Sequence, residues 1–422
     1  MTSREARPGR RRRGSVIAAL VAVAAVMVSL TATACAPTGA ASAAAPASAD
    51  RCTRTDRGRL LSTTPTAHLG EAQVARALTA AHLPGAARAG VDEYRVLYCT
   101  LSPQQAPTVA SALLALPDAA HGALPLVAYE HSTVVATQDA PSFHATGDGL
   151  LAPPYFATDG FAVVAPDYLG LGASPGPHPF MHAASEASAT LDLLPAADRA
   201  AAGLGVRLSH DVLLSGHSQG GAAAMAVGEA LQQENGPWRL RALAPMAGPY
   251  DLGAAELPAI TNPAAVDPHR ASAYLAYLSI EWNTLYPLYS DPGQVFTAPY
   301  AGRIDALFDG THEFTEIAGE LPAPQQLFQP AYLALIAHPT GPLAAALSAN
   351  DVCEWAPRVP TELFAGRADR DVVFANAQHC RAQILAHGGE ATIADMGDVD
   401  HVGTAIAALP VIRTWFASLA VH

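Results

Sequence analysis

Apolar runs that end in turn residues are the feature that most constrains the fold of this chain. These runs carry many β-branched residues, and they are Tyr94–Leu101, Ala110–Pro117, Pro125–His131, Phe161–Tyr168, Asp211–Gly216, Leu240–Gly248, Thr361–Gly366 and Ala391–Met396. Continuous apolar sequence, as opposed to strict alternation with polar residues, is typical of strands that are buried on both faces. The pattern therefore predicts a sheet that is covered on both sides.

Stretches with helical patterning lie between or after these runs, at Met181–Ala197, Gly220–Gln233, Asn376–Gly389 and Thr404–Val421. Strands that alternate with helices predict an open, mostly parallel α/β sheet flanked by helices. A chain of 422 residues is long enough for one large core, or for a core that carries an insertion. We expect residues 51–253 and 350–422 to form this core.

Residues 254–349 break the alternation. They carry aromatic residues and prolines at helical spacing, as in Ala271–Tyr289, and show no clear strand. We interpret this segment as a helical cap inserted over the carboxyl edge of the sheet, where it could act as a lid. The alternative is a set of extra helices that pack on the core, because apolar helical stripes usually face a core.

Residues 1–34 have the pattern of a secretory signal peptide. The basic segment Arg7–Ser15 precedes the apolar segment Val16–Leu30, and small residues follow at Thr31–Cys35. This order predicts export. A transmembrane anchor is the alternative, but the apolar segment is short for a membrane span. The arginines at Arg10–Arg13 leave a twin-arginine export route open.

Cys35 directly follows the Ala-Thr-Ala sequence that ends at Ala34, which resembles a bacterial lipoprotein box. Ala32 stands where such boxes usually carry leucine, so a lipidated form anchored to the membrane and a free secreted form both remain open. The rest of residues 35–50 is rich in alanine, serine and proline, which indicates a flexible tether.

Four further cysteines are expected to form disulfides if the chain is exported to an oxidising compartment. They are Cys52, Cys99, Cys353 and Cys380, and three pairings are conceivable. Proximity along the chain favours Cys52–Cys99 and Cys353–Cys380, and each closed loop would contribute about 3–4 kcal/mol in the chain-entropy model. Four free buried thiols are the alternative. No Cys-x-x-Cys motif or His/Cys cluster suggests a metal site.

The formal net charge of -13, without a basic stripe in the body of the chain, argues against nucleic acid as a partner. The sequence does not indicate an oligomeric state.

The segment Gly216-His217-Ser218-Gln219-Gly220 matches the pattern G-x-S-x-G. The pattern alone is weak, but a buried strand precedes it and a helix of small residues follows it. This context predicts a strand–turn–helix elbow with Ser218 as a nucleophile, and the alternative is a small residue in a glycine-rich loop. The backbone N–H of Gln219 is then the expected first donor of an oxyanion hole.

A serine nucleophile needs a base, and the base needs an orienting acid, in the chain order Ser, acid, His. Asp369 follows the run Thr361–Gly366 and is the expected acid, with Asp371 as its rival. His401 follows the last predicted strand and is the expected base. His379 is expected to lie in mid-helix, and His217 to pack beneath the site.

The second oxyanion donor should lie just after an early strand, which places it at His131 or Ser132. A polar turn without a catalytic role is the alternative. Asp395, Asp398 and Asp400 are expected to be loop residues near His401.

Several motifs together resemble the secretory lipase family of the α/β-hydrolase superfamily. They are Tyr129–Thr133, Pro166–Ser174, His178–Leu194, Gly216–Gly221, Gly366–Asp369 and Asp400–Ala405, in the order of the family. The resemblance spans about residue 51 to the C-terminus and implies an α/β-hydrolase fold with a cap between nucleophile and acid. It implies Ser218, Asp369 and His401 as a catalytic triad, and Gln219 and the residue at His131 as the oxyanion hole. A well-known member of the family carries aspartate where this chain has His131, so the resemblance implies only a backbone role for this residue.

These inferences predict an exported enzyme that hydrolyses carboxylic esters, of lipids or other hydrophobic acyl groups, through an acyl-enzyme. No metal or organic cofactor is required for this chemistry. A serine peptidase and an acyltransferase could use the same triad. A non-catalytic lipid-binding protein is the alternative from a different class, and the intact triad argues against it.

Overall fold

The computed structural model describes residues 51–120 and 122–420, so the predicted signal peptide, nearly all of the tether and Cys35 lie outside the described residues. Its centre is one nine-stranded sheet in the order β1-β2-β3-β5-β4-β6-β7-β8-β9. The strands are β1 (Leu60–Leu69), β2 (Val91–Leu101), β3 (Pro107–Pro117), β4 (Gly122–Glu130), β5 (Ala162–Pro166), β6 (Val206–His217), β7 (Arg239–Met246), β8 (Glu362–Ala365) and β9 (Thr392–Asp395).

The sheet is mixed, and its parallel part carries the site. The strands from β5 through β4, β6, β7 and β8 to β9 pair in parallel, whereas β1, β2 and β3 pair antiparallel. Each strand predicted from the apolar runs is present. The sequence missed β1, whose Thr-rich segment is mostly exposed or half-buried at the edge and has no continuous apolar run.

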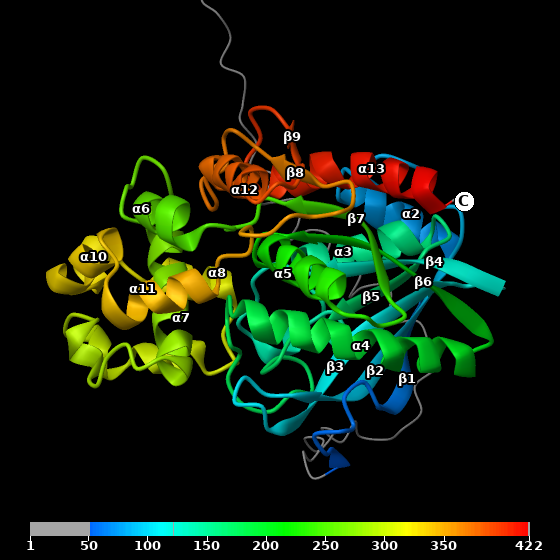
Figure 1. The fold of residues 1–422 in the computed structure, drawn as a ribbon, viewed down its shortest axis with the longest axis horizontal. Helices are drawn as coiled ribbons and strands as arrows, with labels where there is room; N and C mark the ends of the chain where they lie inside the picture. Colours follow the sequence, from blue (N-terminus) through cyan, green and yellow to red (C-terminus); the bar gives the residue numbers. More distant parts are fainter. Residues whose placement is uncertain (1–50, 121, 421–422) are drawn as a thin grey trace, which may run out of the picture.

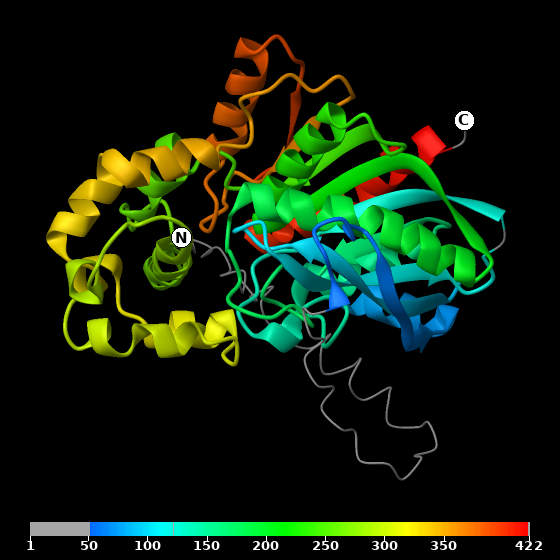
Figure 2. The same ribbon diagram turned by 60° about the horizontal axis from the view of Figure 1, so that its bottom comes forward.

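Helices cover both faces of the sheet, as Figures 1 and 2 show. The helices α4 (Ala183–Gly203), α5 (Gln219–Gln233) and α12 (Ala375–Ala386) contribute to one apolar core. The helices α2 (Glu71–Ala80), α3 (Gly147–Ala157) and α13 (His401–Ala420) contribute to the other. The predicted α/β architecture is thus confirmed, with two cores separated by the sheet.

The sequence did not predict α2 or α3. α3 contains Pro153 and Pro154, which lack a backbone N–H and oppose helix formation in isolation. Tertiary packing overrides this preference, because nearly the whole helix is buried and Phe156 packs against Phe161 and Phe416, with ring centroids 6.2 and 6.0 Å away.

Between β7 and β8 the chain forms a group of helices beside the sheet, at the left of Figure 1. They are α6 (Leu257–Ile260), α7 (Pro268–Leu285), α8 (Phe314–Glu320), α9 (Pro324–Leu327), α10 (Pro330–Ala337) and α11 (Gly341–Ala349). Trp282, Phe296 and Phe328 are fully buried within this part of the chain. Trp282 also donates its indole N–H to the carbonyl of Phe180 at 2.9 Å, which ties α7 to the segment before α4.

Two disulfides are present, Cys52–Cys99 and Cys353–Cys380, with Cα–Cα distances of 5.7 and 5.1 Å. These are the pairs that proximity along the chain favours. The second joins the segment before β8 to α12, so it anchors the stretch of chain that leads to Asp369.

Replacing both Cys353 and Cys380 with serine is expected to lower the free energy of unfolding by about 3–4 kcal/mol, because the unfolded chain loses a cross-link. Urea denaturation of the double variant and the wild type measures this difference. A loss below about 1 kcal/mol would show that the bond constrains the unfolded state much less than the chain-entropy model requires.

Candidate active site

Ser218 lies in the tight turn between β6 and α5, and its backbone is strained. Its φ and ψ are 58° and -123°, a region that residues with a Cβ rarely adopt. The Ser218 N–H donates to the carbonyl of Met246 in β7 at 2.9 Å, which holds the turn against the sheet. The turn brings Ser218 to the boundary of two cavities.

Neighbouring glycines make this turn sterically feasible. A Cβ on Gly216 would lie 2.2 Å from the carbonyl oxygen of Gly220, and a Cβ on Gly220 would lie 2.0 Å from that of Glu130. A Cβ on Gly221 would lie 2.7 Å from the carbonyl oxygen of Met246. Because backbone atoms cannot move away as a flexible side chain can, only glycine fits at these positions.

His401 and Asp369 form a buried hydrogen-bonded pair in the same region. His401 is the first residue of α13, and its Nδ1 lies 2.7 Å from Oδ2 of Asp369, which follows β8. The other oxygen of Asp369, Oδ1, accepts the backbone N–H groups of Asp371 at 2.8 Å and Val372 at 3.0 Å. The acid is thereby fixed on both oxygens, and the Nε2 of His401 is left for another partner.

The two side chains shift each other's pKa. Burial disfavours charge on both, but their mutual attraction and hydrogen bond outweigh it. The pKa of Asp369 is lowered, helped by the backbone N–H groups of Val372 and Asp371. The pKa of His401 is raised, mainly because Asp369 stabilises the imidazolium. This pairing favours a base that can accept a proton and hold it as a stabilised cation.

The other aspartates and the histidine that the sequence placed near the predicted acid and base have other partners. Asp371 forms an ion pair with Arg270 of α7. His379 in α12 lies 3.2 Å from Oδ2 of Asp251. Asp395 is the last residue of β9, which corrects the prediction of a loop residue, whereas Asp398 and Asp400 lie in the loop before α13. Asp395 and Asp398 both pair with Arg367, and Asp400 accepts the Gly403 N–H at 2.7 Å.

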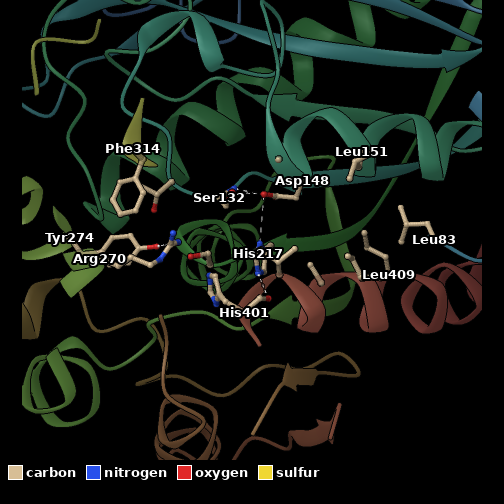
Figure 3. A pocket seen from close by; sticks show the side chains of 16 residues that line it. Leu83, Ser132, Asp148, Leu151, His217, Arg270, Tyr274, Phe314, His401 and Leu409 are labelled. Carbon is tan, nitrogen blue, oxygen red and sulfur yellow. Dashed lines mark hydrogen bonds and ion pairs between the residues drawn. The ribbon is translucent and has the colours of Figure 1, made fainter. Parts of the chain in front are cut away.

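Ser218, His217 and His401 line the first cavity. Figure 3 shows the His217 and His401 side chains in its wall. Much of its wall is apolar, from the core residues Leu83, Leu151, Ala405, Ile406 and Leu409. Arg270, Tyr274 and Phe314, from the helical segment between β7 and β8, line its other side.

A second cavity meets the first at Ser218. Ser218, Thr133 and Tyr274 line both cavities, whereas Gln219 lines only the second. The second cavity is bounded mainly by apolar side chains, which are Phe180, Met181, Pro249, Leu252, Leu257, Ile260, Leu278 and Val372. An extended apolar molecule with its reactive carbon at Ser218 could therefore place one part in each cavity.

One predicted oxyanion residue, Gln219, directly follows Ser218, and the other, His131, follows β4, the strand that pairs with β6. Gln219 is the first residue of α5, so its N–H has no carbonyl acceptor within the helix, and it lies at the positive end of the helix dipole. His131 is buried, and its ring Nδ1 lies 2.6 Å from the carbonyl of its neighbour Ser132. Ser132 and Thr133 line the first cavity, while His131 lines neither. A role for the His131 side chain is thus disfavoured, and its backbone N–H remains the predicted donor.

Asp148 in α3 is a site residue that the sequence did not suggest. It accepts from the Tyr129 hydroxyl at 2.8 Å, from the backbone N–H of Ser132 at 3.2 Å and from the Ser132 hydroxyl. His217 lies near it, with Nδ1 3.6 Å from Oδ1. Burial raises the pKa of Asp148, but these partners outweigh burial and lower it to about 2. The carboxylate therefore fixes the loop after β4.

His217 also approaches the base. Its Nε2 lies 3.2 Å from the carbonyl oxygen of His401, and the two rings have centroids 4.5 Å apart. His217 thus packs against His401 and lines the first cavity, whereas the sequence predicted a position beneath the site. Within residues 51–120 and 122–420, no group of three or more His, Cys, Asp or Glu side chains is arranged to hold a metal ion.

Solved structures resemble this chain along most of its length. The rice cell wall degrading esterase LipA from Xanthomonas oryzae, in a ligand-bound form, is 28% identical with a TM-score of 0.73, covering 86% of this chain and 97% of its own. A protein of Legionella pneumophila, provisionally assigned as a hydrolase, is 27% identical with a TM-score of 0.77, covering 85% of this chain and 98% of its own.

Candida antarctica lipase A shares the fold at 14% identity and a TM-score of 0.60, covering 82% of this chain and 78% of its own. No family model matches the sequence, and a search of curated proteins found no match.

Proposed function

We propose that this chain, which belongs to the esterase and lipase family of the α/β-hydrolase type, is an exported serine hydrolase that cleaves hydrophobic carboxylic esters through an acyl-enzyme. The similarity to esterases and lipases supports ester hydrolysis as the reaction. The nucleophile, the covalent intermediate, the hydrophobic substrate and export are our proposal, and the position of Ser218 at a strained turn beside two cavities supports its role as the nucleophile.

In the first half-reaction the Ser218 hydroxyl attacks the acyl carbonyl while Nε2 of His401 takes its proton. Asp369 holds the imidazole with Nδ1 as the donor and stabilises the imidazolium, which the 2.7 Å contact between them supports. The backbone N–H of Gln219, with that of His131, stabilises the negative oxygen of the tetrahedral intermediate. The intermediate collapses to the acyl-enzyme, and His401 returns the proton to the departing alcohol.

In the second half-reaction a water molecule replaces the alcohol. The water attacks the acyl-enzyme while His401 takes a proton from it. The oxyanion donors again stabilise the tetrahedral intermediate. Its collapse releases the carboxylic acid and returns the proton to Ser218. The protein supplies positioning and electrostatic stabilisation in both halves.

The observation that carries the proposal is the position of Ser218. It sits at a strained turn with φ of 58°, on the boundary of two mostly apolar cavities, one of which also contains His401. Apolar walls on both sides favour substrates with hydrophobic groups over small polar esters. Two disulfides favour an oxidising compartment and so support export.

A panel of 4-nitrophenyl esters with acyl chains of increasing length tests the substrate class. Because longer chains bury more apolar surface, kcat/KM is expected to rise about tenfold or more from the acetate to medium-chain esters. Peptide amides of matched hydrophobicity and added alcohols serve as parallel substrates and acceptors. Faster amide cleavage would favour a peptidase, and ester products with the added alcohol at the expense of free acid would favour an acyltransferase.

A further inference from the structure

The side chain of Gln219 is held from two directions behind the nucleophile. Its Nε2 donates to Oε1 of Glu186 in α4 at 2.8 Å and lies 2.9 Å from Nε2 of His178. Gln219, Glu186 and His178 are all buried. Gln219 is also the residue whose backbone N–H is the proposed first oxyanion donor, so its side chain anchors this donor.

The protonation of His178 suits this contact. Its Nδ1 lies 2.8 Å from the carbonyl of Leu169, which accepts a hydrogen bond and cannot donate one. Nδ1 therefore carries the proton, and Nε2 is free to accept from Gln219. Burial lowers the pKa of His178 to about 4, so the ring is neutral at pH 7.

Tyr168 extends the contacts to the other side of the site. Its ring stacks against His178 with centroids 5.8 Å apart and lies over His131 with centroids 4.3 Å apart. Its hydroxyl donates to the backbone carbonyl of His131 at 3.3 Å. The chain can approach this closely because Gly170 has no side chain, since a Cβ there would lie 2.3 Å from the backbone nitrogen of His178.

We infer that Glu186, His178 and Tyr168 are positioning residues that hold both halves of the oxyanion hole in register, Glu186 and His178 through the Gln219 side chain and Tyr168 through the backbone of His131. This inference rests on the proposed function. It also assigns a role to the motifs Pro166–Ser174 and His178–Leu194, which lie outside the triad.

A small displacement at this place has a large effect on rate. Oxyanion donors act only when they lie at hydrogen-bond distance from the charge that develops in the transition state, and a shift of about 1 Å can cost about 10²-fold. The ground-state ester does not depend on the same contact. Loss of an anchor is therefore expected to lower kcat and to leave KM nearly unchanged.

Glu186→Leu tests the first anchor, because leucine fills a similar volume but cannot accept from Gln219. We expect kcat for a 4-nitrophenyl ester to fall about 10- to 100-fold, with KM within about twofold of the wild type. Glu186→Gln keeps an acceptor oxygen and is expected to stay within about threefold of wild-type kcat. His178→Phe keeps the ring beside Tyr168 but removes the acceptor, and serves as a second variant if Glu186→Leu does not fold.

Double variants separate positioning from a general structural effect. If Glu186 and His178 act through the Gln219 side chain, then Gln219→Ala lowers kcat by a similar factor, and adding Glu186→Leu or His178→Phe to it has little further effect. The inference is wrong if the double variant loses kcat by the product of the two single-variant factors. It is also wrong if Gln219→Ala leaves kcat unchanged. Thermal unfolding of each variant confirms that the comparison is made between folded proteins.

Tyr168→Phe tests the link to His131, with Tyr155→Phe as its matched control. Tyr155 loses the same hydroxyl, which donates to the Pro84 carbonyl at 3.0 Å, and it lines neither cavity. We expect kcat to fall about fivefold or more for Tyr168→Phe only. Equal effects would overturn the role of Tyr168. A wild-type protein that cleaves no ester would instead refute the proposed function, so the two failures are distinguishable.

Discussion

Ser218→Ala is expected to lower kcat for ester hydrolysis by about 10⁴- to 10⁶-fold, because no other group at the turn can form the acyl-enzyme. The residual rate would come from the oxyanion donors and from substrate binding. The fold should persist, since alanine keeps the Cβ that the strained turn already accommodates. Steady-state kinetics with a 4-nitrophenyl ester and thermal unfolding measure the two effects.

Ser215→Ala is the matched control for this change. Ser215 lies in the same strand, β6, and its hydroxyl donates to the Ala244 carbonyl at 2.7 Å, away from both cavities. A fluorophosphonate probe should label the wild type and Ser215→Ala at Ser218, and should not label Ser218→Ala. Retention of more than about 1% of wild-type activity by Ser218→Ala would exclude it as the nucleophile.

The elements around the site could be predicted because local sequence and tertiary environment agree there. The run Asp211–Gly216 is apolar on both faces of a central strand, and Gly216, Gly220 and Gly221 are required by backbone contacts that only glycine permits. Asp369 and His401 each follow a strand of the parallel part, where chain order constrains their position.

Other parts could not be predicted because their determinants are not local. The edge strand β1 is mostly exposed or half-buried and lacks an apolar run, while α3 contains two prolines and forms through burial. Asp148 reaches the site only because α3 packs beside β4, and no motif marks it. Arg270 of α7 lines the first cavity although it is far from the nucleophile in the sequence. Its ion pair with Asp371 holds it there.

Replacing Asp369 is the second change that we expect to lower activity strongly, because Asp369 orients His401. Asp369→Asn should keep the acceptor for the Asp371 and Val372 N–H groups, but its amide would face Nδ1 of His401 with a donor. The imidazole would then carry its proton on Nε2 and could not accept the Ser218 proton. We expect kcat to fall about 10⁴-fold at neutral pH.

The pH dependence of the residual activity tests the same contact in a second way. The base must be neutral, so kcat/KM rises with pH through the pKa of His401, which Asp369 raises above its ordinary value. Without the Asp369 carboxylate, the main group that opposes the effect of burial is lost and the pKa of His401 falls, so the rise should move to lower pH in Asp369→Asn. Asp371→Asn is the control for the other candidate acid. If this variant loses more kcat than Asp369→Asn does, Asp369 is not the residue that orients His401. A pH profile that does not move in Asp369→Asn would lead to the same conclusion.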